Sequence, residues 1–347
     1  MSDSLRNQLL QQPVEASAPC RIDAGGTWDI KAMALPFEKV DPTTINAALN
    51  LRTSVLLCPF DDGWMKITSE GFPKGVVFRR GQFSFKPPFG LFFGAAAHFD
   101  VHGLEIRIKS GSPVKSAMGG SSTALVAFIK ALSKVTGMKP MSGKKILHLA
   151  YSLEDAISGG NCGLQDQAAA VYGGVSQWKW RYGDGSVPFE RISLLDRRGE
   201  KEFSKRLLVA YSGKSHVSAT TNRKWIEDFL NGRTREGWIH VNEIVHQIAK
   251  AIKRQDWGQV ALGLQEEMAL RKMLTPEALI PITDKLIDQA GRVGFGARFS
   301  GAGAGGSIWA IGPMKNLEEL RHLWADTLKP VKKAGILHCE IDPIGVK

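Results

Sequence analysis

Residues 119–124, Gly-Gly-Ser-Ser-Thr-Ala, combine a glycine turn with hydroxyl side chains where a helix is expected to begin. Upstream, Leu104–Ile108 alternates as in a half-buried strand, and downstream apolar residues recur at helical spacing from Leu125. The first N–H groups of a helix lack partners within the helix, and the helix dipole favours negative charge there. The segment is therefore a candidate phosphate site, and a serine hydroxyl in it can reach a metal ion. An ordinary serine N-cap after a flexible turn is the alternative.

Two more glycine-rich segments occur in the chain, one near the start and one near the end. The first runs from Pro19 to Asp29 and contains Gly25-Gly26-Thr27. The second, residues 300–307, reads Ser-Gly-Ala-Gly-Ala-Gly-Gly-Ser and precedes a strand-like run at 308–311. Each one alone is compatible with an ordinary loop. Three in this order, with the serine-rich one at a helix start, are hard to attribute to chance.

A fourth segment contains two acidic residues that could do chemistry together. Glu154 lies late in an amphipathic helix, and Asp166 follows a turn that contains Gly159-Gly160 and Gly163. A carboxylate is the hard oxygen ligand that Mg²⁺ prefers, which makes Glu154 a candidate metal ligand. Asp166 is a candidate general base, although its spacing alone favours a capping or turn aspartate.

Together these segments resemble the three motifs of the GHMP kinase superfamily, from about Ala18 to the C-terminus. Residues 165–174, with Gln-Asp-Gln, a run of alanines and Tyr-Gly-Gly, are most similar to the sugar 1-kinase branch, in particular bacterial heptose kinases and fucokinase. By the same motifs the chain is a poor match to mevalonate kinase. The resemblance implies an α+β protein of two lobes. These are a ribosomal-S5-like N-terminal lobe over residues 18–196 and a ferredoxin-like C-terminal lobe over 205–347, with residues 195–201 as a linker or hairpin.

The resemblance implies an ATP-dependent kinase that phosphorylates the anomeric hydroxyl of a sugar or sugar phosphate. A heptose 7-phosphate is the leading acceptor, with fucose and galactose as alternatives. Asp166 would take the proton of the attacking hydroxyl, and Arg21 beside it would keep that carboxylate ionised. A sensor that binds ATP and sugar without catalysis is the alternative on the same fold, but a sensor has no need of Glu154, Asp166 and Arg21 together.

The resemblance also assigns the residues that would hold ATP and Mg²⁺. Glu154 and Ser121 are the implied metal ligands, with Ser122 as the second choice of hydroxyl. The serine-rich loop would bind the ATP phosphates through its N–H groups, and the last glycine loop would approach from the other lobe. The implied nucleotide-binding residues are Met118, Gly119, Gly120, Ser121, Ser122, Gly301, Gly303 and Gly305. The chain departs from the family at Ala117, where Gly is usual, and at Gly120, where Ser is common.

Four residues are candidates for contact with the acceptor. By the resemblance Asp29 would accept hydrogen bonds from sugar hydroxyls; an N-cap or a surface aspartate is the alternative. Trp28 could stack on a sugar ring, although a large aromatic is more often packed in a core. Ser212 and Gly213 open the loop 212–218, which is rich in phosphate-compatible donors and is equally compatible with a solvated loop.

Composition limits the classes of protein that the chain can be. With 347 residues and 43% apolar content, it can bury one large core or two smaller ones. It contains no apolar run long enough to cross a bilayer and no signal-peptide pattern, so we expect a cytoplasmic protein without membrane contact. Its four cysteines, Cys20, Cys58, Cys162 and Cys339, are scattered and are predicted to be free thiols.

The net charge of +11 suggests a polyanionic partner such as nucleic acid. The basic residues, however, are spread along the chain as pairs such as Arg79-Arg80 and Lys332-Lys333, without interleaved aromatics. A phosphate-handling enzyme would also be basic. We therefore expect a small-molecule substrate and no nucleic acid; the sequence is silent on oligomeric state.

Overall fold

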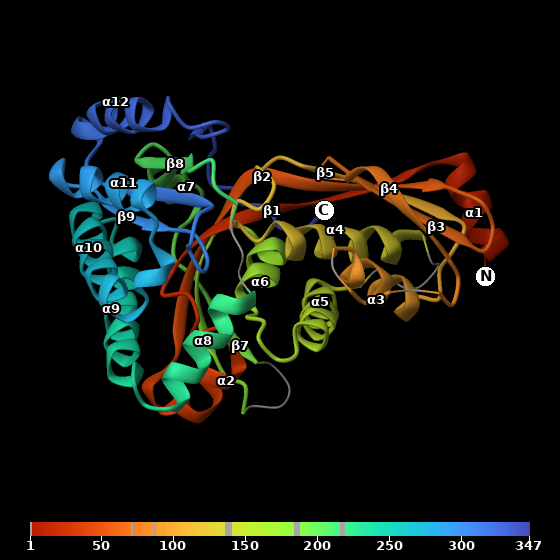
Figure 1. Cartoon of the computed structure of the whole chain (residues 1–347), viewed down its shortest axis with the longest axis horizontal. Coiled ribbons are helices and arrows are strands. Elements are labelled where there is room, and N and C mark those ends of the chain that lie inside the picture. Colours follow the sequence, from red (N-terminus) through yellow and green to blue (C-terminus); the bar gives the residue numbers. More distant parts are fainter. Residues whose placement is uncertain are drawn as a thin grey trace.

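Two lobes, each built on one β-sheet, make up the described part of the chain (Figure 1). The computed structural model describes residues 2–70, 72–82, 84–86, 88–135, 141–183, 188–215 and 219–347. The predicted two-lobe α+β class is confirmed. Within these residues, no helix is long and apolar enough to span a membrane.

The first lobe is a mixed sheet with helices against one face. Among the described residues its strands are β1 (Val14–Ala24), β2 (Thr43–Pro59), β3 (Trp64–Ser69), β4 (Phe72–Arg79), β5 (Leu104–Ser110), β6 (Val175–Trp180) and β7 (Phe189–Ser193). The order is β4-β3-β5-β2-β6-β7, with β1 also paired to β2, and only β3 and β5 run parallel. Its helices are α1 (Ser2–Gln11), α2 (Lys31–Ala34), α3 (Gly90–His98), α4 (Gly120–Val135), α5 (Gly143–Ser158), α6 (Gln165–Tyr172) and α7 (Arg197–Ser204). Figure 1 shows α3, α4, α5 and α6 on the same side of the sheet.

The second lobe has the ferredoxin-like order that the sequence predicted. Its described strands are β8 (Leu207–Tyr211), β9 (Gly296–Phe299), β10 (Ser307–Ile311) and β11 (Gly335–Leu337). They are ordered β11-β8-β10-β9, and each neighbouring pair is antiparallel, as in a split βαβ unit. Its helices are α8 (Ala219–Leu230), α9 (Arg235–Lys253), α10 (Trp257–Leu274), α11 (Pro281–Arg292) and α12 (Leu317–Leu328).

Helix α4 brings the serine-rich segment into the core of the first lobe. It lies against β1 and β2, and the side chains of Ala124–Ile129 are all buried. The helix begins at Gly120, and the N–H of Thr123 donates to the carbonyl of Gly119 at 2.8 Å. The first turn, with its unpaired N–H groups, therefore follows directly on the glycine loop, as the sequence predicted.

The stretch 195–201, expected to be a linker or hairpin, instead enters helix α7. The carboxylate of Asp196 caps this helix by accepting from the N–H of Gly199 at 2.8 Å. Asp is among the residues most favoured at an N-cap, so the polar composition marked a helix start and not an irregular connection.

The last residues of the chain return to the first lobe. Asp342 forms an ion pair with Arg52 on β2 at 2.5 Å, and its carbonyl accepts from Gly174 N at 2.7 Å. The carbonyl of Lys347 accepts from the N–H of Ser17 on β1 at 3.0 Å. The end of the segment predicted as the second domain therefore packs on the first.

Candidate active site

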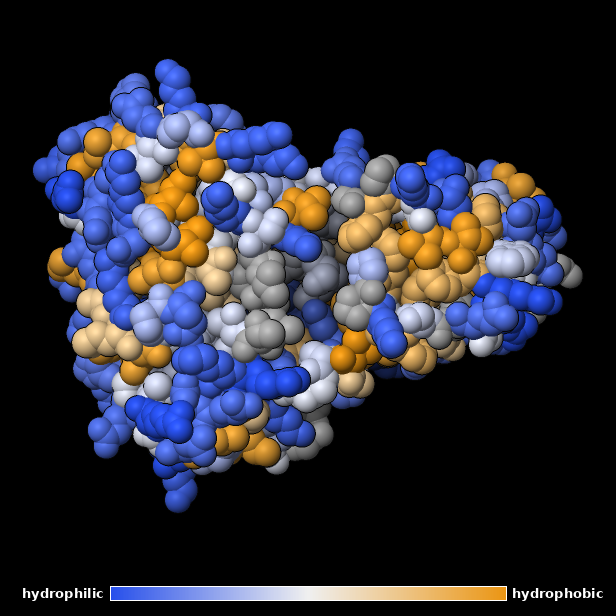
Figure 2. All heavy atoms as spheres, in the orientation of Figure 1, coloured by the Kyte–Doolittle hydropathy of each residue, from blue (hydrophilic) through white to orange (hydrophobic). Residues whose placement is uncertain are grey.

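A cavity of about 510 Å³ is lined by all four segments that the sequence singled out. Its walls come from β1, the serine-rich loop before α4, the α5–α6 connection and the loop after β9, together with residues of α3 and α8. Figure 2 shows the surface hollowed between the wider part of the molecule and the narrower extension. The site therefore lies where the two lobes meet.

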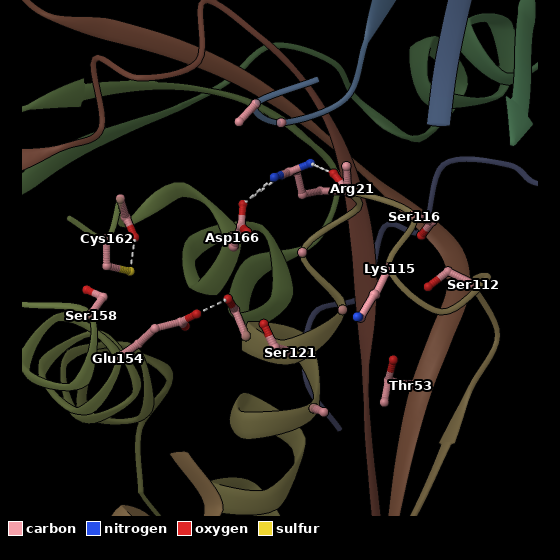
Figure 3. A pocket seen from close by; sticks show the side chains of 18 of the residues that line it. Arg21, Thr53, Ser112, Lys115, Ser116, Ser121, Glu154, Ser158, Cys162 and Asp166 are labelled. Atoms are coloured by element: carbon pink, nitrogen blue, oxygen red, sulfur yellow. Dashed lines mark hydrogen bonds and ion pairs between the residues drawn. The ribbon is translucent and has the colours of Figure 1, made fainter. Parts of the chain in front are cut away.

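Asp166 and Arg21 point toward one another in this cavity (Figure 3). The Asp166 side chain, in the first turn of α6, is 25% exposed, whereas Arg21 on β1 is buried. Nε of Arg21 donates to Oδ1 of Asp166 at 2.7 Å, and Nη1 donates to the carbonyl of Ala117 at 2.8 Å. Burial alone lowers the pKa of Arg21, but the carboxylates of Asp166 and Asp23 outweigh burial and raise it. The guanidinium is therefore a permanent positive charge beside the Asp166 carboxylate.

Gly119 lets the serine-rich loop approach Asp166 closely. Its φ is +76°, and a Cβ added there would lie 3.1 Å from Cγ and Oδ2 of Asp166. Ala117 has a φ of +62°, in the left-handed region that favours glycine and that costs about 1 kcal/mol in other residues. The loop therefore has a strained backbone at Ala117, which lowers the stability of the folded state.

Glu154 is held between two neighbours on the cavity wall. Its Oε1 accepts from Oγ of Ser122 at 3.0 Å, and its Oε2 accepts from Nε2 of Gln167 at 2.6 Å. Burial raises the pKa of Glu154 to about 7, with a smaller contribution from Asp166. Ser121, the predicted metal ligand, lines the cavity with an exposed side chain, and no hydrogen bond joins it to Glu154. Of the two hydroxyls, the structure therefore pairs Ser122 with Glu154 and not the first choice, Ser121.

The oxygens of Glu154 and Ser122 suit a Mg²⁺ ion. A carboxylate whose pKa is raised by burial also lacks a compensating cation, which a bound metal would supply. Among the described residues no three His, Cys, Asp or Glu side chains cluster as a metal site. The remaining ligands would therefore have to come from phosphate oxygens and water.

Asp29 is buried in the wall of the cavity. Its Oδ2 accepts from the N–H of Gln165 at 3.1 Å, and its Oδ1 accepts from Nε2 of Gln165 at 3.3 Å. Burial raises the pKa of Asp29 to about 7, and the Asp166 charge adds to the effect. A Cβ at Gly163 would clash with the carboxylate, so the glycine is needed for this packing.

The raised pKa values of Asp29 and Glu154 predict a pH-dependent stability. Both carboxyls take up a proton more readily in the folded state, with pKa values of about 7 against ordinary values of 3.8 and 4.5. The free energy of unfolding is therefore greatest below the ordinary values of 3.8 and 4.5, and it falls as the pH rises from there to about 7. We expect calorimetry without nucleotide or divalent cations to give a melting temperature several degrees lower at pH 8 than at pH 6.

Glu154→Gln should reduce this difference in melting temperature, because the variant has one fewer proton to lose. Glu190→Gln, at an exposed position of β7, is the control and should leave the difference unchanged. A melting temperature equal or higher at pH 8 in the unaltered protein would contradict the prediction.

Trp28 is not available to stack on a sugar. Its ring is fully buried, its Nε1 donates to the carbonyl of Trp238 at 3.0 Å, and its ring meets the edge of Phe229 at 5.5 Å. The indole instead packs against residues from α8 and α9. The prediction of substrate contact by Trp28 is therefore wrong.

Other predicted contacts also lie away from the cavity. The Met118 side chain is buried in the core, and its carbonyl accepts from the N–H of Arg21 at 3.1 Å. Gly303 packs against Ala278, and neither it nor Gly305 lines the cavity, in contrast to Gly301.

The loop after β8 supports the last glycine loop. The N–H of Ser212 donates to the carbonyl of Gly306, whose own N–H donates to the carbonyl of Lys214. Neither Ser212 nor Gly213 lines the cavity, so their predicted contact with substrate is not supported. Residues 216–218 of the predicted loop lie outside the described part of the chain.

The last glycine loop does buttress the serine-rich loop, as predicted. The N–H of Ser307 donates to the carbonyl of Ser116 at 2.8 Å, and a Cβ at Gly306 would clash with Ala117. Gly301 lies against the carbonyl of Ala117. The two loops therefore bring both lobes to one edge of the cavity.

Several residues of the site were not singled out from the sequence. Gln165 and Gln167, which flank Asp166, hold the carboxylates of Asp29 and Glu154. The Gln-Asp-Gln pattern was a usable signal, since polar residues on both sides of a candidate base are available for such contacts. Arg223, on α8, also lines the cavity and was not marked by any motif.

Comparison with known proteins identifies two domains of one family. Residues 90–174 match the family model "GHMP kinases N terminal domain", and residues 248–328 match "GHMP kinases C terminal". Each model lies within one of the two lobes.

Similar curated proteins include kinases of different acceptors. A mevalonate kinase from Methanocaldococcus jannaschii is 25% identical over 209 residues, covering 59% of this chain and 61% of its own length. A galactokinase from Actinobacillus pleuropneumoniae is 26% identical over 270 residues, with 67% of each chain covered. A D-glycero-alpha-D-manno-heptose 7-phosphate kinase from Campylobacter jejuni is 26% identical over 224 residues, covering 62% of this chain and 63% of that protein. This chain thus matches less than two thirds of the length of the mevalonate and heptose kinases.

Solved structures share the fold over almost the whole chain. The Lactococcus lactis galactokinase complexed with galactose superposes with a TM-score of 0.76 at 16% identity, covering 99% of both chains. A D-glycero-D-manno-heptose 1-phosphate kinase from Bacteriodes thetaiotaomicron has a TM-score of 0.70 at 19% identity, covering 96% of this chain and 97% of that one. Both family models match in the order of the two lobes, so the chain carries the N-terminal and C-terminal domains of the GHMP kinases.

Proposed function

We propose that the chain is an ATP-dependent kinase that phosphorylates the anomeric hydroxyl of a sugar or sugar phosphate. The observation that carries this proposal is the Asp166–Arg21 pair at 2.7 Å, in a cavity that also contains the start of α4. A carboxylate beside a permanent cation and next to a phosphate-compatible helix start is what transfer to a hydroxyl requires.

In the proposed reaction Asp166 accepts the proton of the attacking hydroxyl. Arg21 orients the Asp166 carboxylate and stabilises negative charge nearby during the transfer. The N–H groups at the start of α4 bind the phosphates, and Glu154 and Ser122 would hold Mg²⁺, which neutralises phosphate charge when bound. Asp29 lines the same cavity as Asp166 and orients the acceptor by accepting hydrogen bonds from the acceptor's hydroxyls.

A heptose 7-phosphate is the leading acceptor, with fucose and galactose next. The similarity to a heptose 7-phosphate kinase supports it, although galactokinases and mevalonate kinases are equally similar. Arg223 gives independent support, because this exposed residue lines the cavity and no carboxylate among the described residues is paired with it. An unpaired guanidinium there suits an acceptor that already carries a phosphate.

The test is an ADP-release assay with Mg-ATP against free and phosphorylated sugars, including mannoheptose 7-phosphate, fucose, galactose and mevalonate. Phosphorus NMR of the product then locates the new phosphate. A product phosphorylated at the anomeric carbon supports the proposal. Turnover of mevalonate alone contradicts the sugar assignment, and ATP binding without turnover of any acceptor favours the sensor.

Arg223→Met should weaken the binding of a phosphorylated acceptor selectively. We expect its KM for a sugar phosphate to rise on the order of 10-fold or more, with the KM for ATP unchanged, because one charge-assisted contact is lost. Steady-state kinetics with both substrates varied measure this effect.

The neighbouring Lys224 offers a matched control for Arg223. Its Nζ is already paired with Asp228 and Glu277 at 3.0 Å, and it does not line the cavity. Lys224→Met removes the same charge and should leave both KM values unchanged. Equal effects of the two substitutions would mean that Arg223 acts only through the overall charge.

A further inference from the structure

Asp23 is a buried carboxylate that contacts both lobes at once. Its Oδ1 accepts from the N–H of Gly301, in the last glycine loop, at 2.7 Å and lies 3.3 Å from Nη1 of Arg21. Its Oδ2 accepts from Nη1 of Arg298 on β9 at 2.7 Å. Although burial alone would raise its pKa, Arg298 and Arg21 hold the pKa of Asp23 below its ordinary value. Asp23 is therefore an ionised carboxylate that links Arg21 to the second lobe.

Arg298 is itself fixed on its other side. Its Nε donates to both carboxylate oxygens of Glu267 on α10, at 3.1 and 3.0 Å. Its Nη1 also donates to the carbonyls of Asp23 and Phe299 at 2.8 and 2.9 Å. Since the Arg298, Asp23 and Glu267 side chains are fully buried, water cannot replace these partners.

The chain of contacts ends on the proposed base. Nη1 of Arg21 lies 3.3 Å from Oδ1 of Asp23 and donates to the carbonyl of Ala117 at 2.8 Å, whereas Nε donates to Asp166 at 2.7 Å. The guanidinium is planar, so fixing one edge of it determines where the edge facing Asp166 lies. The orientation of that edge thus depends on a residue held by the second lobe.

We propose that Asp23 and Arg298 are positioning residues that hold Arg21 against Asp166, so that the base is oriented only while the second lobe is docked. This inference rests on the proposed kinase function. It adds that the second lobe, besides closing the cavity, fixes the geometry of the catalytic pair through one buried carboxylate. A small displacement of Arg21 is enough to matter, because a misplacement of about 1 Å can cost on the order of 10²-fold in rate.

The test measures kcat and both KM values for Arg298→Met, Arg298→Lys and Asp23→Asn. We expect Arg298→Met and Asp23→Asn to lower kcat on the order of 10²-fold with little change in either KM. Arg298→Lys, which keeps the charge beside Asp23, should recover part of the rate. If Arg298→Met does not fold, the lysine and asparagine variants carry the test.

A double-mutant cycle separates positioning from general destabilisation. If Arg298 acts through Arg21, the kcat losses of Arg21→Lys and Arg298→Met must be strongly non-additive. Arg52→Met is the control, because it breaks a partly buried ion pair with Asp342 that touches neither the cavity nor Asp23. It should lower stability and leave kcat of the folded protein unchanged. Additive losses, or an Arg298→Met variant that behaves like Arg52→Met, overturn the inference.

A readout without turnover separates this inference from the proposed function. The N–H of Gly301 is protected by Asp23, so its hydrogen exchange should accelerate in Arg298→Met and not in Arg52→Met. If the unaltered protein turns over none of the acceptors, the proposed function fails while the exchange result still reports on docking. Unchanged exchange in Arg298→Met contradicts the link between Arg298 and the loop.

Discussion

Asp166→Asn lowers kcat by about 10³-fold while the protein still binds ATP and acceptor, which is the range expected for loss of a general base. The amide keeps the shape of the carboxylate, and its oxygen can still accept from Nε of Arg21. It cannot, however, take the proton of the attacking hydroxyl. Rapid-quench or steady-state kinetics give kcat, and titration calorimetry with a non-hydrolysable ATP analogue gives the dissociation constants.

Asp100→Asn serves as the control for the loss of one carboxylate. Asp100 is exposed and paired with Arg80 far from the cavity lining, so its replacement should not change kcat. Survival of turnover in Asp166→Asn, with binding intact, would show that another group takes the proton. Asp29 would then be the next candidate, since it lies in the same cavity.

Glu154→Gln lowers kcat on the order of 10²-fold at a fixed Mg²⁺ concentration and raises the concentration needed for half-maximal activity. The substitution removes the negative charge that would attract the ion while keeping an oxygen in place. Burial has already raised the pKa of Glu154 to about 7, so metal binding should also weaken as the pH falls below 7 in the unaltered enzyme. Activity titrated with Mg²⁺ at several pH values measures both effects.

Ser121 and Ser122 form a matched pair for the same question. Ser122→Ala removes the hydroxyl that donates to Glu154, whereas Ser121→Ala removes an exposed hydroxyl without a bond to Glu154. We expect the larger rise in the Mg²⁺ requirement from Ser122→Ala. The reverse order would restore Ser121 as the metal ligand.

The parts of the site that the sequence predicted depend on local rules. A glycine turn before a helix places free N–H groups and serine hydroxyls together whatever the rest of the chain does, so residues 119–122 were identifiable. Asp166 and Arg21 required the family resemblance, because 145 residues separate them and no spacing rule joins them. Their meeting depends on β1 and α6 lying side by side in the fold.

What the sequence did not predict depends on packing between distant elements. The burial of Trp28 is decided by Trp238 and Phe229, which come from the other lobe. The choice of Ser122 over Ser121 depends on which side of α4 faces α5, which glycine-rich composition does not specify. The contact between Asp23 and Arg298 spans 275 residues, so no local pattern could reveal it.

The return of the final residues to β1 and β2 has a consequence for synthesis on the ribosome. The backbone of Ser17 and the side chain of Arg52 bond to each other and find further partners in residues 342–347, which are synthesised after the strands of both lobes. The first lobe can collapse around its helices early, but the contacts of β1 and β2 with residues 342–347 can form only after the second lobe has been made. The native contacts of β1 and β2 are therefore completed only after the second lobe has been synthesised, and a chain stalled before residue 342 would leave these contacts unmade.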